Sequence, residues 1–320
     1  MKRLLSVLLF LLISCAPVAR DPNALSVADA PPAPRLAGMT SSAYVILAGE
    51  RVYYEVGGSG TPVVFVHGIG AGNSMHLYRQ NTLALSKQHR VYAFDFPGFA
   101  RSGAQPIQYT NELYVQVLRE FLQKVVREPA AVIGGSYGAD YAIRVAAENP
   151  ELITKLLLAN PSGYGFSDEA RLARGSDRFR RNPDLFNQYA TTPIGLFLFQ
   201  ILSGEGGLNF FLYNTVYLNG NLVTPELTRI YQQNLEGANK AFAPFSFFAG
   251  MLAQDVSEYW AKLKQPTYLV WGNEDVFTPI TESRYFLEAR PVPMAVVRAR
   301  AVPYDEAFEK FNKIALQFLK

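Results

Sequence analysis

A glycine-rich segment between a predicted strand and a predicted helix constrains this fold more than any other feature. Gly134-Gly135-Ser136-Tyr137-Gly138 follows the apolar run at 130–133 and precedes helical spacing over 139–148. A turn this tight strains its central residue and admits only glycine at the flanking positions. It exposes the Ser136 hydroxyl at the sheet edge, beside the positive end of a helix. The segment therefore predicts a nucleophilic serine at position 136.

Strands and helices alternate along most of the chain. Short apolar runs typical of buried strands occur at 62–66, 91–94, 130–133, 153–158, 266–271 and 294–297. Helical spacing occurs at 74–88, 111–126, 139–148, 281–287 and 305–319, and β-rich runs at 44–47 and 52–56 predict a hairpin across Gly49-Glu50. Such alternation indicates the α/β class, with a mainly parallel sheet and helices on both faces.

The alternation stops between residues 162 and 256, where the sequence is helical and aromatic. We interpret this segment as a helical cap inserted over one end of the sheet. We expect most of its large apolar side chains to pack in the core, and the rest to line an apolar cavity above Ser136. These side chains are Leu196–Phe199, Phe210–Tyr213, Tyr217, Phe242, Phe245, Phe247 and Phe248.

The N-terminus has the pattern of an export signal. Lys2 and Arg3 precede an apolar run over residues 4–13 that is too short to span a bilayer. The run ends in Leu12-Ile13-Ser14-Cys15, which looks like a bacterial lipobox, and Cys15 is the only cysteine. We therefore expect lipidation of Cys15 and a membrane-anchored location at the bacterial cell envelope. The alternative is an ordinary signal peptide followed by an incidental cysteine.

These patterns divide the chain into five segments. We expect a signal peptide over residues 1–14 and a lipidated tether, rich in proline and alanine, over 15–41. The predicted α/β core occupies 42–161 and 257–320, on either side of the cap at 162–256.

Composition excludes several other functions. The 320 residues are 49% hydrophobic and 18% charged, which is typical of a folded domain and not of a disordered chain. The formal net charge is +3, with no block of like charges, so we expect no nucleic acid partner. No metal-ligand cluster or phosphate-binding loop occurs in the sequence, which predicts neither a metal nor an organic cofactor.

Four motifs in a fixed order identify a family resemblance. They are His67-Gly68-Ile69-Gly70, Asp95-Phe96-Pro97-Gly98-Phe99-Ala100-Arg101-Ser102, the segment around Ser136, and Trp271-Gly272-Asn273-Glu274-Asp275. Together they resemble the α/β-hydrolase superfamily of serine hydrolases and esterases, over roughly residues 44–320. The cap and its junction at Asp255 resemble cyanobacterial and plant hydrolases that dephytylate chlorophyll.

The resemblance implies a role for each motif. Ser136 is the expected nucleophile, and the backbone N–H groups of Ile69 and Tyr137 are the expected oxyanion hole. Asp275 is the expected triad acid, with Glu274 as either a surface charge or a substitute. We expect His67, and the loop from Asp95 to Arg101, to brace the site and not to react.

The histidine of the family's triad is missing. When Pro303 and Glu306 are aligned with the family's Pro-x-x-Glu segment, Ala301 takes its place, and no histidine follows His89. A serine hydroxyl is a poor nucleophile without a neighbouring base. Three explanations remain open. A substitute base acts (Tyr304, Glu306, His76 or a cap residue), the protein is a degenerate homologue, or the stretch at 298–301 is misread or misaligned.

Two functional hypotheses follow. The first is a serine hydrolase of apolar carboxylic esters, impaired by the loss of the triad histidine. The second is a non-catalytic lipoprotein that keeps the hydrolase scaffold and binds an apolar, lipid-like ligand at the cell envelope.

Overall fold

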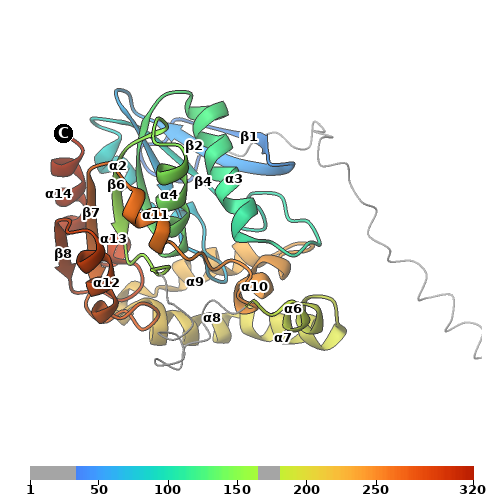
Figure 1. The fold of residues 1–320 in the computed structure, drawn as a ribbon. Helices are drawn as coiled ribbons and strands as arrows, with labels where there is room; N and C mark the ends of the chain where they lie inside the picture. Colours follow the sequence, from blue (N-terminus) through green and yellow to red (C-terminus); the bar gives the residue numbers. More distant parts are fainter. Residues whose placement is uncertain (1–33, 165–180) are drawn as a thin grey trace, which may run out of the picture. The chain divides into compact units, whose positions relative to one another are not determined.

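An eight-stranded sheet forms the centre of the computed structural model, which describes residues 34–164 and 181–320 (Figure 1). The strand order is β1-β2-β4-β3-β5-β6-β7-β8. β1 and β2, and β2 and β4, pair antiparallel, whereas all other neighbours pair parallel. The strands are β1 (Ser41–Leu47), β2 (Glu50–Gly57), β3 (Pro62–Val66), β4 (Arg90–Phe94), β5 (Ala130–Gly135), β6 (Ile153–Ala159), β7 (Thr267–Gly272) and β8 (Met294–Val297). The predicted α/β class is confirmed.

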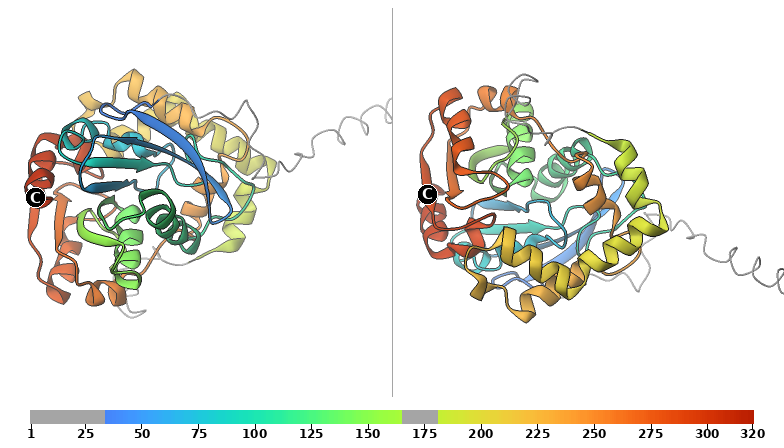
Figure 2. Two further views of the ribbon diagram at one scale, coloured as in Figure 1. Left: turned by 90° about the horizontal axis from the view of Figure 1, so that it is seen from above. Right: turned by 90° about the horizontal axis from the view of Figure 1, so that it is seen from below.

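Helices cover both faces of the sheet, as the alternation predicts (Figure 2). Every residue of the central strands β3 and β5 is buried, because parallel strands with helices on both sides have no solvated face. One face packs against α3 (Asn111–Phe121), α4 (Tyr137–Glu148), α11 (Ser257–Lys262) and α12 (Ser283–Ala289). The other packs against η2 (Met75–Tyr78), α2 (Thr82–Leu85), α13 (Pro303–Glu306) and α14 (Phe308–Phe318).

Several element boundaries differ from the prediction. The hairpin turns at Ala48 and Gly49, whose φ angles are 50° and 80°, so that Glu50 already belongs to β2. The helical spacing at 74–88 corresponds to two short helices, η2 and α2, and that at 305–319 to α13 and α14. The last turn of the helix predicted at 111–126 is a π-turn, η3 (Leu122–Val126). η6 (Ile280–Glu282) precedes α12.

The folded domain begins before residue 42, the boundary that the sequence predicts. Leu36 and Met39 are buried in the core, and Glu55 accepts hydrogen bonds from the backbone N–H groups of Arg35 and Leu36. The buried carboxylate therefore fixes the end of the predicted tether to β2. The predicted signal peptide, Cys15 and the tether up to residue 33 lie outside the described residues.

The described part of the cap, residues 181–256 between β6 and β7 in the chain, is mainly helical and lies below the sheet in Figure 1. Asn182, Thr192 and Thr224 each accept a hydrogen bond from a first-turn N–H, and proline follows each of them at the first helical position. The helices are α6 (Pro183–Ala190), α7 (Pro193–Ser203), α8 (Glu205–Phe211), η4 (Leu212–Val216), η5 (Gly220–Leu222), α9 (Pro225–Leu235) and α10 (Phe242–Phe248).

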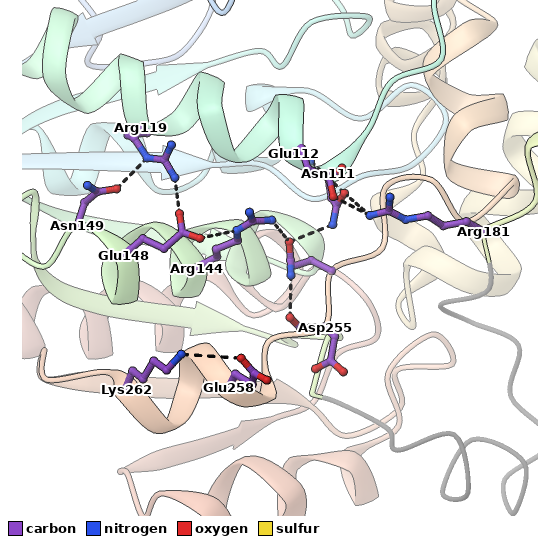
Figure 3. A network of polar contacts seen from close by, with 11 residues as sticks. Asn111, Glu112, Arg119, Arg144, Glu148, Asn149, Arg181, Asp255, Glu258 and Lys262 are labelled. Carbon is purple, nitrogen blue, oxygen red and sulfur yellow. Dashed lines mark hydrogen bonds and ion pairs between the residues drawn. The ribbon is translucent and has the colours of Figure 1, made fainter.

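A polar network ties the cap to α3 and α4 (Figure 3). Arg181 donates hydrogen bonds to Oδ1 of Asn111 at 2.7 Å and to Oε1 of Glu112 at 2.8 Å. Where the chain leaves the cap, Gln254 Oε1 accepts from Asn111 Nδ2 at 3.0 Å and from Arg144 at 2.8 Å. Asn111 and Gln254 are buried, so their amides depend on these partners. The network therefore fixes both ends of the described cap segment over the sheet.

The expectation that most of the cap's large side chains are core residues is wrong for the α7–α8 region. Phe197 is 61% exposed and Phe210 is 71% exposed, whereas Leu212, Tyr217 and Phe245 are buried. The sequence of α7 is apolar on every side, so periodicity alone does not indicate which side the protein covers.

Candidate functional site

Ser136 lies at the turn between β5 and α4 with φ of 49° and ψ of −127°, a strained conformation for a residue with a side chain. Its N–H donates to the Ala159 carbonyl at 2.9 Å, which holds the turn to β6. A Cβ on Gly138 would lie 2.6 Å from the Val66 carbonyl oxygen, so only glycine fits there. Ser136 is partly exposed between buried neighbours, and its exposed side borders a cavity. The structure thus places Ser136 as the sequence predicts.

His67 and Asn73 orient the predicted oxyanion loop. Nε2 of His67 accepts from the Phe96 N–H at 2.9 Å, so the ring proton is on Nδ1, which donates to the Gly68 carbonyl at 2.8 Å. Asn73 Nδ2 donates to the same carbonyl at 3.1 Å. In a trans peptide the N–H points away from the carbonyl of the same unit. Fixing the Gly68 carbonyl therefore also fixes the direction of the Ile69 N–H.

His67 is a structural residue in this geometry. Complete burial lowers its pKa to about 4, so the imidazole is neutral at neutral pH. Asp95 has a similar bracing role: it accepts from the Met75 N–H at 2.8 Å and from the Arg101 N–H at 3.2 Å, and burial raises its pKa to about 6. Neither side chain borders the cavity at Ser136.

Asp275 is buried after β7, and each of its carboxylate oxygens accepts a hydrogen bond. Asn160 Nδ2 donates to its Oδ2 at 2.7 Å, and the Phe277 N–H donates to its Oδ1 at 2.8 Å. Asn160 follows β6 with φ of 44°, and its Oδ1 accepts from the Gly272 N–H at 2.9 Å. Glu274 is exposed, which leaves Asp275 as the carboxylate in the triad acid's position.

A cavity of about 440 Å³ connects the predicted site residues. Ser136, Ile69, Tyr137 and Ala301 all border it, as do the residues that follow Asp275. They stand at the carboxyl ends of parallel strands, where open α/β sheets bind ligands. The full lining is Gly68, Ile69, Gly70, Asn73, Ser136, Tyr137, Ser162, Phe211, Val216, Phe247, Phe248, Gly250, Val276, Phe277, Thr278, Ala301, Val302 and Tyr304.

The cavity lining lacks an evident base among the described residues. Tyr304 borders it, but burial raises the pKa of its phenol well above the usual value, so at neutral pH the phenol is a donor. Glu306 is bound to the backbone N–H groups of Arg300 and Asn219 instead. His76 borders a separate small pocket beside Asp95. Of the three named substitutes, only Tyr304 reaches the cavity, in its protonated form.

Ala301 borders the cavity with a small side chain. Its N–H donates to the Val216 carbonyl at 3.2 Å, which joins this loop to the cap. The neighbouring Arg300 directs its guanidinium to the carbonyls of Tyr213 and Tyr217, at 2.8 and 3.1 Å, and does not border the cavity. The Arg300 side chain therefore takes up no space in the cavity beside Ala301.

Two site residues were missed by the sequence analysis. Asn160 holds Asp275, and Ser162 borders the cavity while its N–H and Oγ donate to Asp140 on α4, at 3.0 and 2.8 Å. Their position just after the carboxyl end of β6 is the only sequence signal that favours them.

Comparisons with known proteins agree with this geometry. The sequence model of a family described as alpha/beta hydrolase fold matches residues 61–301. The 2-hydroxy-6-oxo-6-phenylhexa-2,4-dienoate hydrolase of Burkholderia cepacia is 26% identical over 283 residues, which cover 85% of this chain and 92% of the relative. The 2-hydroxy-6-oxononadienedioate/2-hydroxy-6-oxononatrienedioate hydrolase of Comamonas testosteroni is 27% identical over 278 residues, with coverages of 85% and 92%.

Solved structures show the same fold. A meta-cleavage product hydrolase from Pseudomonas fluorescens IP01 superposes with a TM-score of 0.69 at 22% identity, covering 87% of this chain and 97% of the other. A thermophilic esterase from Thermogutta terrifontis gives a TM-score of 0.67 at 19% identity, with coverages of 88% and 98%. The likeness of the cap to chlorophyll-dephytylating hydrolases stays a prediction. On the family match and the fold, this chain belongs to the alpha/beta hydrolase fold family.

Proposed function

We propose that this protein is a serine hydrolase of neutral, apolar carboxylic esters that works without a triad histidine, and therefore slowly. The observation that carries the proposal is Ser136, held at φ of 49° on the wall of the 440 Å³ cavity. Strain of this kind persists only where the surrounding structure enforces it, and it is typical of functional residues.

The cavity lining supports a neutral substrate. Its described residues include no lysine, arginine, histidine, aspartate or glutamate, and Phe211, Phe247, Phe248 and Phe277 supply aromatic surface. The Burkholderia cepacia and Comamonas testosteroni relatives are named for dienoates, which are carboxylate anions. Among the described lining residues an anionic group would find no cationic partner to replace its lost hydration. We therefore propose that the substrate differs from those dienoates in lacking a carboxylate.

The missing base determines which steps are slow. In acylation the Ser136 oxygen bonds to the ester carbonyl carbon, the carbon–oxygen bond to the alcohol breaks, and the hydroxyl proton passes through water to the departing alcohol. Oxyanion donors and binding alone leave ~10³–10⁴-fold acceleration over water when a triad member is missing. Hydrolysis of the acyl-enzyme also needs a base, so the acyl group should remain on Ser136 for many minutes.

A second candidate is a non-catalytic carrier of an apolar ligand. It is favoured by the sequence, which has no histidine after His89, so no imidazole follows Asp275 in the chain to act as the triad base. In this case the same cavity would bind an ester or lipid without covalent chemistry.

The experiment that separates the two candidates uses the full chain and its Ser136→Ala variant. We would incubate each with a fluorophosphonate probe and with p-nitrophenyl esters of increasing acyl length. Labelling that needs Ser136, with a burst of nitrophenol followed by slow turnover, supports the hydrolase. The carrier is supported by absent labelling together with equal binding of a fluorescent fatty ester by both chains, and that result overturns the first proposal.

Matched esters test the predicted neutrality of the substrate. Replacing the terminal methyl of the best acyl chain by a carboxylate keeps its length and adds one charge. We expect the carboxylated ester to react at least tenfold more slowly, because the cavity offers the charge no partner. Equal rates would show that the substrate class is wrong while leaving the role of Ser136 intact.

Anchorage at the cell envelope through Cys15 also remains a proposal. It rests on the lipobox-like sequence and on the apolar run that precedes it. Growth of an expressing bacterium with an alkynyl fatty acid should label the wild-type chain and leave Cys15→Ser unlabelled. Equal labelling of the two chains would exclude lipidation at this cysteine.

A further inference from the structure

The outer surface of α7 and α8 exposes large apolar side chains without any role in the cavity. Ile194 is 74% exposed, Phe197 is 61% exposed and Phe210 is 71% exposed. None of these three borders the cavity. We call this surface the cap face. It comprises Ile194, Leu196, Phe197, Leu198, Ile201, Leu202, Phe210 and Tyr213, all of them exposed in the described structure.

The cap face is almost uncharged. From residue 185 to residue 225 the only charged side chain is Glu205. Soluble proteins rarely expose apolar patches larger than a few hundred Å², and such patches commonly mark a binding surface. Interfaces between proteins usually combine an apolar centre with a polar rim that forms about ten hydrogen bonds. With one charged side chain, this segment could form such a rim only through uncharged groups, and large apolar side chains dominate its exposed part.

The geometry of the two helices suits the surface of a bilayer. Among the described residues no single helix is long and apolar enough to cross a membrane. Together, Pro193–Ser203 and Glu205–Val216 are long and apolar enough for a membrane span, but the two helices meet at a bend of 69°. Two short helices at such an angle, which lie on the same side of the sheet in Figure 2, present a broad surface instead of a rod. Helices that lie in the membrane interface bury their apolar faces ~5–10 Å deep in the boundary between headgroups and acyl chains.

The cap face adjoins the cavity that holds Ser136. Phe211 and Val216 come from the same helical segment and line the cavity, and Phe248, on α10, lines it while remaining 56% exposed. Neutral apolar esters accumulate in membranes, because each buried CH₂ group contributes ~0.8 kcal/mol. A bilayer against the cap face would therefore lie next to the helical segment that lines part of the cavity.

The N-terminal segment would permit this contact. Residues 16–33 separate Cys15 from the first described residue. An extended chain of this length spans roughly 55 Å, which exceeds the ~19 Å radius of gyration expected for a domain of about 290 residues. A tether longer than this radius would let the domain turn relative to the bilayer, so an anchor at Cys15 is compatible with docking.

From these observations we propose that the cap face docks onto a lipid bilayer and inserts the side chains of α7 and α8 into its interface. The proposal goes beyond the hydrolase function and does not depend on the chemistry of Ser136. The cap face carries no lysine or arginine, so apolar burial and not attraction to anionic lipid would drive docking. We therefore expect docking to be insensitive to salt.

Tryptophan emission tests the proposal on the full chain. The two natural tryptophans, Trp260 and Trp271, are fully buried, so a quencher in the membrane does not reach them. Phe197→Trp places a reporter on the cap face. Leu83→Trp is the matched control, because Leu83 is 50% exposed on α2, which lies far from α7 in Figure 1. Each chain is reconstituted with vesicles of phosphatidylethanolamine and phosphatidylglycerol, with or without brominated acyl chains.

We expect brominated lipid to quench the added emission of Phe197→Trp about twofold or more and to leave Leu83→Trp unchanged, at low and high salt alike. Adding Ile201→Glu to Phe197→Trp should remove most of the quenching, because a carboxylate in the bilayer is costly. Equal, weak quenching of the two reporters would overturn the proposal. The proposal would also be overturned if the chain without vesicles formed a dimer in which the tryptophan at position 197 is shielded from solvent. A second copy of the chain would then cover the cap face.

Discussion

Asn160 donates one hydrogen bond to Oδ2 of Asp275, at 2.7 Å, and another to the carbonyl of Arg300, at 3.0 Å. One amide group therefore joins the predicted triad acid to the residue before Ala301. We predict that this loop, held next to Asp275 by Asn160, carries the position of the family's triad histidine at Ala301. On that prediction the site is a triad scaffold that lacks its base.

Ala301→His should restore a base to this scaffold. We expect at least a 10²-fold rise in the turnover of a p-nitrophenyl ester, because general base catalysis contributes 10²–10⁴-fold. The rate should rise with pH through a pKa near 6.5, where imidazole loses its proton. Stopped-flow and steady-state assays on the variant and on Ala301→Gln, which adds bulk without a base, check the prediction. A similar gain in both variants would attribute it to shape alone.

Asp275→Asn should affect activity differently in the natural chain and in the Ala301→His chain. In the natural chain no imidazole depends on Asp275, so the substitution should change turnover less than threefold. In the Ala301→His chain it should cost 10²-fold or more, because the carboxylate orients the imidazole and stabilises its charged form. The four chains form a double-mutant cycle, and additive effects in that cycle would contradict a restored triad.

The parts of this structure that could be predicted from sequence are those with local signals. Pro62–Val66 and Met294–Val297 were predicted to the residue because each is a short apolar run with clear ends. The position of Ser136 followed from its flanking glycines. The contact between Asn160 and Asp275 spans 115 residues of chain, and no local pattern encodes it.

Surface exposure in the cap was the other failure of prediction. Phe197 and Phe245 are the same residue type in apolar helices, yet Phe197 is 61% exposed and Phe245 is buried. Which side of an apolar helix is covered depends on neighbours such as α10, whose placement comes from tertiary packing.

His67 should resist protonation well below the usual pH range. Its pKa is lowered to about 4 by burial, so the folded state takes up no proton there between pH 7 and pH 5, while the unfolded state does so near 6.5. The unfolded state binds more protons, so this residue alone should lower the free energy of unfolding by about 2 kcal/mol between pH 7 and pH 5. Below pH 4 His67 is protonated in both the folded and the unfolded state, so it lowers the free energy of unfolding no further.

Ring ¹⁵N NMR checks the first part of that prediction, since His67 should keep its Nδ1–H tautomer at pH 5. Urea unfolding of the wild type and His67→Asn checks the second part. The variant should be less stable at pH 7, and its disadvantage should shrink by about 2 kcal/mol at pH 5. Asp95, whose raised pKa has the opposite effect, is common to both chains and cancels in the comparison. A disadvantage that stays constant with pH would contradict the assignment.

Gly135→Ala should displace the turn that carries Ser136. A Cβ at position 135 would lie 2.5 Å from Cε1 of Tyr304, and Tyr304 is buried against Tyr78 with ring centroids 4.6 Å apart. Because neither ring has space to withdraw, we expect the free energy of unfolding to fall by about 1–3 kcal/mol. The displaced turn should also reduce fluorophosphonate labelling of Ser136 at least tenfold, because small shifts of a nucleophile are costly.

Gly206→Ala is the matched control for that substitution. Gly206 lies in α8, and a Cβ there would meet nothing within 4 Å. We expect it to stabilise the chain by about 0.5–1 kcal/mol, because alanine loses less backbone entropy than glycine in a helix, and to leave Ser136 labelling unchanged. Urea unfolding and probe labelling of the two variants measure both effects. If Gly135→Ala labelled as fast as Gly206→Ala, the packing of Tyr304 would have no part in positioning Ser136.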